Sequence, residues 1–420
     1  MDNGQRLSIR HLAILPQRII ILTLFLFSLI VSFIFLLFFR NIGPLEHRIP
    51  GSDYFDRYTP ITQSILNGKG IGIQKNSPVT GTPGYPFFLV PLLGISHFFG
   101  VDELSLIVFF NVLLSACASS LLFLLIGATF SREIGVIASL LWSSYPLNLW
   151  FIKNPNTEVP FMVILLLSLV FYLMAVRQKS ALPACVAGVL LGVAILIRPI
   201  ALFLPFLLFL FFFFTVSKLR RAFQKSLVFL LGTALILVPW ISYASVKSGR
   251  FVPVSSLGSP AAFIGLTFAF VGNEQNQLAV PEDVRALMQR IGDAHPLSSK
   301  AIISLLFQEV RTHPISLGKL LVLKLLRAWY ATYGMWWEKE LFLLQLPYLL
   351  TAGMGIYLSL KRPPSFPLGR SLLLMVVFYF WALTFLGISI VRYMVPAMAF
   401  LMGFSALFIK NALIKFKLLL

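Results

Sequence analysis

The sequence predicts an all-helical protein that crosses a membrane about ten times. Of its 420 residues, 58% are hydrophobic and only 12% are charged, and the mean hydropathy is +0.88. A soluble domain carries about a quarter charged residues, so a soluble fold could not bury this much apolar surface. Two longer polar stretches interrupt the apolar runs. They predict a first outer loop with a juxtamembrane helix, and a second outer segment that is small and mostly helical.

Ten apolar runs have lengths that suit transmembrane helices, which need about 20 residues each. The first follows a basic leader, and no small-residue cleavage site comes after it, which indicates an uncleaved signal anchor. An even number of crossings then places both termini in the cytoplasm. The ten runs are 19-39, 104-128, 134-152, 158-176, 181-197, 200-216, 228-246, 341-360, 371-390 and 393-409.

The distribution of charge supports this topology, because cytoplasmic loops are enriched in Lys and Arg. The segments placed inside hold 16 of the 34 Lys and Arg residues but only two of the 15 acids, Asp2 and Glu133. The net charge of +19 therefore reflects membrane topology and contact with anionic lipids, and it does not indicate a nucleic-acid partner.

Four regions follow from the positions of the spans and loops. They are a cytoplasmic leader (1-18), a transmembrane module (19-246) that contains the first outer loop (40-103), an outer-face segment with an interfacial helix (247-340), and the C-terminal transmembrane helices (341-420).

The first outer loop contains two local signals. Thr59 as N-cap, Pro60 at the first helical position and Gly68 just past the end predict a short helix from about 60 to 67. The prolines of 83-86 predict a turn that positions the next stretch, 87-99, which is too short to cross and is expected to be re-entrant or interfacial.

The second outer segment contains polar helix candidates around 281-292 and 298-311. The apolar stretch 316-337 carries Lys319, Lys324 and Arg327, and burying each cation in lipid would cost about 2.5 to 3.5 kcal/mol. We therefore expect an interfacial amphipathic helix there.

Ionisable side chains on the predicted outer face are the candidate functional residues, because charges near the hydrocarbon are costly and usually have a role. Simple alternatives are that the arginines extend to lipid phosphates, and that a carboxylate merely pairs with Arg57 or Lys153. The candidates are Asp53, Asp56 and Arg57 in the first loop, Lys153 and Glu158 around the turn 154-157, Arg198 in the hairpin before Pro199, and Arg392 in the last hairpin.

This set suits sugar transfer from a lipid phosphate. The phosphate leaves already ionised, so it needs cations or a metal and no strong general acid. The acceptor hydroxyl or amine needs a base, which one carboxylate can supply. A loop aspartate with Lys153, Arg198 and Arg392 meets these needs, although other anionic substrates would fit as well.

The same residues resemble the GT-C superfamily of membrane glycosyltransferases, particularly the branch similar to protein O-mannosyltransferases and the lipid A aminoarabinose transferase. The resemblance covers about 15 to 250 and the final hairpin. The matching pieces are a first-loop aspartate followed by Tyr58 and 68-70, then 83-89, Thr157-Glu158, Gly188 and Gly192 leading to 197-199, and Arg392-Tyr393 with Pro396. For the two glycines we expect a role in close helix packing.

The resemblance implies a polyprenyl-phosphate sugar donor, an acceptor that is a protein, lipid or glycan, and catalysis by the transmembrane module at the outer face of a bacterial inner membrane. It implies a first-loop aspartate as base or site organiser. Asp53 is preferred because it follows Gly51-Ser52 at the loop entry, and Asp56 is the competitor. Many relatives have an acidic pair in this loop, whereas Tyr54 follows Asp53 here, so the identity of the second carboxylate stays open. The expected roles are catalytic for Asp53, Asp56 and Glu158, and phosphate-binding for Arg57, Lys153, Arg198 and Arg392.

Some superfamily members bind a divalent metal, but the sequence contains no clear ligand cluster, so no metal or other cofactor is assigned and a divalent metal stays open. The main alternative function is a transporter or flippase for a lipid-linked sugar, which would favour inverted repeats and charged helices near the bilayer midplane. Neither feature is found in the sequence. A third possibility is a non-catalytic assembly protein of envelope biogenesis.

Overall fold

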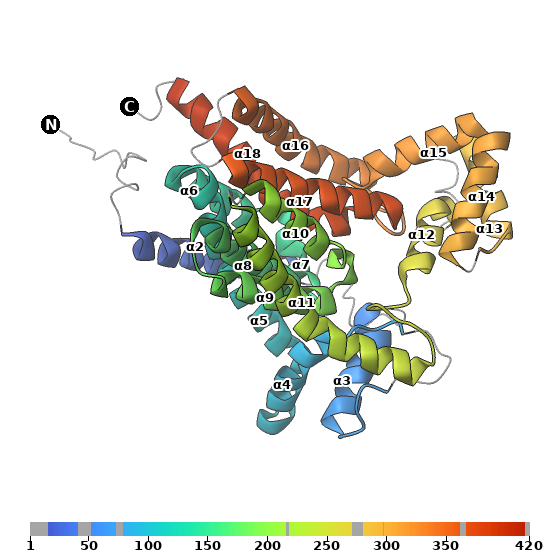
Figure 1. Ribbon diagram of the computed structural model, residues 1–420, viewed down its shortest axis with the longest axis horizontal. Coiled ribbons are helices and arrows are strands. Elements are labelled where there is room, and N and C mark those ends of the chain that lie inside the picture. The colour runs from blue at the N-terminus through green and yellow to red at the C-terminus, as the bar shows by residue number, and fades with distance from the viewer. Residues whose placement is uncertain are drawn as a thin grey trace. The chain divides into compact units, whose positions relative to one another are not determined.

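The computed structural model describes residues 16–40, 52–72, 79–215, 218–270, 280–296, 298–361 and 367–415. These ranges contain helices, turns and irregular chain but no strand, which confirms the predicted all-helical class (Figure 1). The leader up to residue 15 and the loop entry at 41–51 lie outside the described residues, as does any expectation about them.

The chain divides into two compact units, which are described separately here. The first unit comprises Met1–Val254, Thr351–Leu374 and Ala399–Leu420, and the second comprises Ser255–Leu350 and Met375–Met398. All of the predicted site residues except Arg392 belong to the first unit.

Seven described helices are long and apolar enough to cross a membrane, and a bent helix pair raises the number to eight. The two other predicted spans are shorter apolar helices, α9 (Leu182–Ile197) and the segment formed by η3 (Pro199–Ala201) and α10 (Leu204–Thr215). The predicted count of ten is therefore not confirmed. The seven long helices are α2 (Gln17–Phe39), α5 (Glu103–Thr129), α8 (Glu158–Arg177), α11 (Leu219–Ser248), α16 (Glu338–Lys361), α17 (Pro367–Leu386) and α18 (Val391–Lys415).

The predicted span 134-152 is broken into α6 (Arg132–Ser143) and α7 (Pro146–Ile152), which meet at a bend of 56°. The break follows from Pro146, because a proline pushes the preceding residue out of the helical region. Tyr145 accordingly has an extended backbone, with φ −70° and ψ 118°. The bend directs α7 toward the turn that precedes α8.

Close helix packing in the first unit depends on glycine. Helix α9 packs against both α8 and α11 (Figure 1). A Cβ atom on Gly188 would lie 2.0 Å from the carbonyl oxygen of Phe229, and one on Gly192 would lie 2.8 Å from Cβ of Ile236. Small residues four apart thus let the backbones of α9 and α11 approach, as the sequence predicted.

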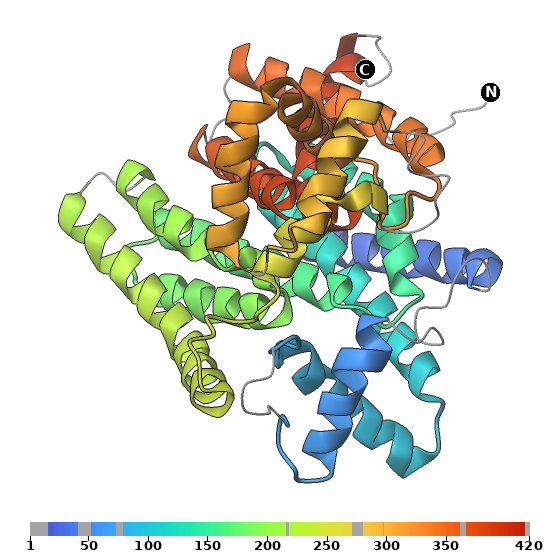
Figure 2. The same cartoon turned by 90° about the vertical axis from the view of Figure 1, so that its right-hand side faces the viewer.

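The first outer loop forms a five-residue π-helical turn, η2 (Tyr54–Tyr58), which continues directly into α3 (Thr59–Leu66). Thr59 is therefore not the N-cap that was predicted, because the helical backbone already begins before it. Gly68 does follow the helix, with φ +70°. Figure 2 shows α3 beside α4 (Gly84–Phe99), a 16-residue helix that includes most of the predicted turn 83-86.

The second unit contains α12 (Gly258–Leu266), η4 (Phe268–Phe270), α13 (Glu282–Asp293), α14 (Ser299–Thr312) and α15 (Pro314–Arg327). The helices predicted at 281-292 and 298-311 are confirmed as α13 and α14. Helix α15 has 14 residues, which is too short to cross a membrane.

The predicted interfacial helix at 316-337 needs a correction in its extent and in the placement of its cations. The helix ends at Arg327, and of its three cations only Lys319 is exposed. Lys324 and Arg327 are buried inside the unit, where Arg327 makes two bonds of 2.7 and 2.8 Å with Glu338. Protein partners therefore accommodate two of the three charges that the sequence assigned to an interface.

Candidate active site

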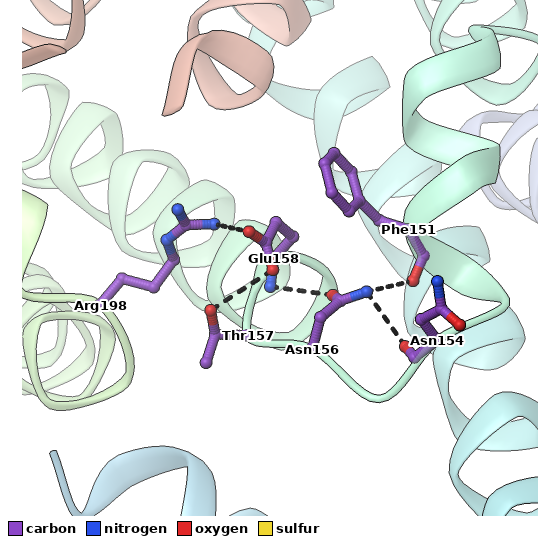
Figure 3. Close-up of polar contacts among 6 residues, drawn as sticks. All are labelled: Phe151, Asn154, Asn156, Thr157, Glu158 and Arg198. Carbon is purple, nitrogen blue, oxygen red and sulfur yellow. Dashed lines mark hydrogen bonds and ion pairs between the residues drawn. The ribbon is translucent and has the colours of Figure 1, made fainter. Parts of the chain in front are cut away.

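A buried ion pair joins the start of α8 to the end of α9 (Figure 3). Nη1 of Arg198 lies 2.7 Å from Oε1 of Glu158, and the two side chains are only 6% and 3% exposed. Glu158 is the first residue of α8 and Arg198 follows the last residue of α9, so each charge opposes the partial charge of its own helix end. Pro199 fixes the break that releases Arg198 from the helix.

The turn before Glu158 is held by its own asparagines. The side-chain oxygen of Asn156 accepts the backbone N–H of Glu158 at 3.1 Å, which satisfies one of the free N–H groups in the first turn of α8. The amide nitrogen of Asn156 donates to the carbonyl oxygens of Phe151, at 2.6 Å, and Asn154, at 3.0 Å (Figure 3). The hydroxyl of Thr157 donates to the second carboxylate oxygen of Glu158. This turn therefore fixes the carboxylate in position.

Lys153, at the other end of the turn, is also buried. It is 2% exposed, and its ammonium lies 3.3 Å from the centre of the Trp150 ring. A cation over an indole face gains a favourable interaction of about 2 kcal/mol when desolvated. The amide of Asn111, on α5, donates to the carbonyls of Ile152 and Asn154 on either side of Lys153. The turn therefore fixes a buried cation at one end and a buried carboxylate at the other.

The first-loop residues form a second, more exposed ion pair. Nη1 of Arg57 lies 2.8 Å from Oδ1 of Asp53, one helical turn apart, with side chains 36% and 39% exposed. The carboxylate of Asp56 is exposed and makes no hydrogen bond or ion pair with the described part of the chain. The two candidate aspartates thus differ, because Asp53 is oriented by a cation and Asp56 is not.

Tyr54 anchors this loop. Its side chain is buried, and its hydroxyl donates a hydrogen bond to the carboxylate of Glu103 at the start of α5. Burial, and then the neighbouring Glu103 carboxylate, raise the pKa of Tyr54 well above its ordinary value, so the hydroxyl stays protonated as a donor. A π-helical turn is uncommon and frequently marks a functional site.

Arg392 does not lie in a hairpin, as the sequence predicted, but in the first turn of α18. It belongs to the second unit, and its expected phosphate-binding role stays a prediction. The structure thus brings together Asp53 with Arg57, and Glu158 with Arg198, and it places Lys153 in the turn that precedes Glu158.

Sequence reasoning missed several residues that shape the site. Asn156 carried a signal, since an asparagine in a turn often accepts the backbone N–H two residues further on. Asn111 stood alone in an apolar helix, which in a membrane marks a side chain with a polar partner. Trp150 precedes Lys153 by three residues, the helical spacing at which two side chains meet, so this contact also carried a local signal. The bond between Tyr54 and Glu103 depends on a tertiary contact, for which local sequence carries no signal.

No three His, Cys, Asp or Glu side chains lie together as a metal site within the ranges that the structure describes. Arg57 lies against one carboxylate oxygen of Asp53, and Arg198 lies against one carboxylate oxygen of Glu158. No chemical step below involves a metal.

The fold is that of a multi-helix membrane protein and is similar to the GT-C fold, as the resemblance of the sequence implied. Residues 83–243, which contain both Glu158 and Arg198, match the family described as dolichyl-phosphate-mannose-protein mannosyltransferase. No curated protein matches the chain.

Solved structures of an oligosaccharyltransferase from Archaeoglobus fulgidus are similar to almost the whole chain. The apo form has a TM-score of 0.59 at 14% identity, and the complex of the archaeal enzyme AglB with an inhibitory peptide and a dolichol-phosphate has 0.56 at 12%. Each match covers 95% of this chain and 51% of the other. A form tethered with an acceptor peptide has a TM-score of 0.57 at 16% identity. The chain thus spans about half the length of these proteins, and the likeness establishes the fold.

Proposed function

We propose that the protein is a glycosyltransferase that moves a sugar from a polyprenyl-phosphate carrier to an acceptor on the outer face of the membrane. The observation that carries the proposal is the buried pair of Glu158 and Arg198, together with the buried Lys153 at the other end of the same turn, within the segment that matches the mannosyltransferase family. Fixed cations of this kind are what a departing lipid phosphate requires.

In the proposed reaction the acceptor oxygen or nitrogen attacks the anomeric carbon of the sugar. The bond from that carbon to the phosphate oxygen breaks, and the polyprenyl phosphate leaves with the bonding electrons. Lys153 and Arg198 stabilise the negative charge on the leaving phosphate, and Arg57 and Arg392 are the further candidates for this role. A guanidinium carries five N–H donors, so the ion pair with one carboxylate uses only some of the donors of Arg198.

The proton of the acceptor passes to a first-loop carboxylate. Asp53 is the preferred base, because Arg57 orients its carboxylate at 2.8 Å, as a supporting group orients a catalytic base. Asp56 is the competitor, since its exposed carboxylate has no partner among the described residues. Glu158 acts in this proposal by holding Arg198 in place, and no proton transfer is assigned to it.

The donor class is supported by the archaeal oligosaccharyltransferase, whose structures are described as complexes with a dolichol-phosphate or with a tethered acceptor peptide. The matching family is likewise described by a dolichyl-phosphate sugar donor. These names support a lipid-linked donor and a separate acceptor for this chain, without specifying the sugar.

Complementation of a deletion strain tests the proposal. Mass spectrometry of surface glycans and glycoproteins should show a sugar missing from the strain and restored by the wild-type gene. Asp53→Asn should not restore it, because removing a general base lowers the rate by about 10²- to 10⁴-fold. Asp56→Asn is the parallel variant, and Asp293→Asn, an exposed aspartate on α13, is the matched control that should complement fully. Full complementation by both Asp53→Asn and Asp56→Asn would refute a first-loop base.

A further inference from the structure

The segment 79–84, called the bridging segment below, runs between the first loop and the last turn of α9. At the α9 end the hydroxyl of Thr82, which is 2% exposed, donates to the carbonyl of Ile197 at 3.4 Å. A Cβ on Gly84 would lie 2.5 Å from the carbonyl carbon of Leu196 and 2.6 Å from the nitrogen of Ile197. The bridging segment therefore meets α9 backbone to backbone, immediately before Arg198.

At its other end the bridging segment meets the first loop. A Cβ on Gly81 would lie 2.5 Å from Cδ1 of Ile61, on α3, and 3.9 Å from the carbonyl oxygen of Arg57. Tyr85, the next residue after the bridging segment, is fully buried, and its ring meets the edge of the Tyr58 ring at 5.0 Å. One short stretch of chain thus contacts the elements that carry both ion pairs.

We propose that the bridging segment sets the spacing between the first-loop carboxylates and Arg198, and that Gly84 is a positioning residue for the transfer. The inference rests on the proposed function, in which Asp53 or Asp56 acts on the acceptor while Arg198 acts on the phosphate of the same reacting pair. The first-loop carboxylate and Arg198 must be held at a fixed separation, because a misplacement of about 1 Å can lower a rate by about 10²-fold.

Alanine at position 84 would disturb this spacing. Ordinary contacts of a Cβ begin near 3.4 Å, and the atoms it would meet at 2.5 to 2.7 Å belong to the backbone of α9, which cannot rotate aside as a side chain can. The bridging segment must therefore move away from α9 by about 1 Å. A Cβ on Gly94, in the same helix α4, would meet nothing within 4 Å, so Gly94→Ala is the matched control.

Transfer rates per folded molecule test the proposal in detergent-purified full-length protein, with the lipid extract of a deletion strain as donor. Gly84→Ala should lower kcat by about 10- to 100-fold, whereas Gly94→Ala should leave it unchanged. If Gly84→Ala has the wild-type rate once the folded fraction is measured, the proposal is overturned.

A second pair of variants separates positioning from general damage to the fold. Gly81→Ala should also lower kcat, because its Cβ would collide with Cδ1 of Ile61. Adding Ile61→Val removes that atom and should restore the rate. Failure of this rescue, with the double variant folded, would show that the bridging segment does not act through its spacing.

A distance measurement keeps this proposal distinct from the proposed function. Spin labels at the exposed positions Asn67 and Phe203, on a background without the two native cysteines, report the separation of the first loop and the chain just after η3, which follows α9. Gly84→Ala should change the mean distance by about 1 Å and Gly94→Ala should not. An unchanged distance in Gly84→Ala overturns the positioning role. A changed distance in Gly84→Ala, combined with a wild-type protein that shows no transfer, would refute only the proposed function.

Discussion

Breaking the buried ion pair between Glu158 and Arg198 should destabilise the protein strongly. At 2.7 Å and an effective dielectric constant of about 20, two unit charges attract by roughly 6 kcal/mol, and the cost of desolvating both ions offsets part of this. Glu158→Met leaves Arg198 charged and buried without its partner, as Arg198→Met does for Glu158. Each single variant should lose about 3 to 5 kcal/mol.

The double variant is the informative one. Replacing both members of a buried pair by apolar side chains of similar size is often neutral, so Glu158→Met with Arg198→Met should lie within about 1 kcal/mol of the wild type. The free energy of unfolding is measured by titration with a denaturing detergent in mixed micelles. A double variant that loses the sum of the two single losses would refute the coupling.

The ion pair between Lys319 and Asp283 is the matched control for this cycle. Its N–O distance is similar, 2.9 Å, but its side chains are 51% and 39% exposed. Solvent screening leaves such pairs little effect on stability, so the same cycle should show no measurable coupling. A coupling as large as that of the buried pair would show that burial is not the cause.

Three further predictions concern packing, pH and the turn before α8. Gly188→Ala should lose about 1 to 3 kcal/mol or more, because its Cβ would meet the α11 backbone at 2.0 Å, while Gly94→Ala in open space should match the wild type in detergent unfolding. Burial, and then the charge of Arg327, lower the pKa of Lys324 from 10.5 to about 7. Between pH 7 and 10.5 the unfolded chain binds more protons than the folded protein, so the free energy of unfolding should rise as the pH increases through this range. Lys324→Met should reduce that rise. An equal rise in the wild type and in the variant would exclude Lys324 as its source. Asn156→Ala should lose about 1 to 2 kcal/mol because it leaves the buried N–H of Glu158 without its acceptor, and an unchanged midpoint would show that this bond contributes nothing.

The sequence was sufficient for the elements that depend on local patterns. Long apolar runs identified α2, α5 and α8, because burial of a whole helix sets this signal, and the polar helix candidates of the second outer segment correspond to α13 and α14. Span number was harder to predict, since helices such as α9 and α10 are apolar but shorter than a full crossing.

The sequence predicted which residues belong to the site better than it predicted which of them form ion pairs. Glu158 and Arg198 were assigned separate roles, whereas the fold brings them into one ion pair from residues 40 positions apart in the sequence. Lys324 and Arg327 were expected at an interface, but tertiary partners such as Glu338 and the carbonyl of Gly387 accommodate them in the interior. Such contacts are set by helix packing, which no local pattern encodes.

Bond cleavage in a reconstituted system tests the central claim most directly. Vesicles are prepared with purified protein and the lipid extract of a deletion strain, in which the unused donor should accumulate, and mass spectrometry follows both lipid products and acceptor. The account predicts that the wild-type protein converts the sugar lipid to free polyprenyl phosphate and a glycosylated acceptor, and that Asp53→Asn does not. A sugar lipid that changes leaflet with its sugar–phosphate bond intact would contradict the account and indicate a flippase.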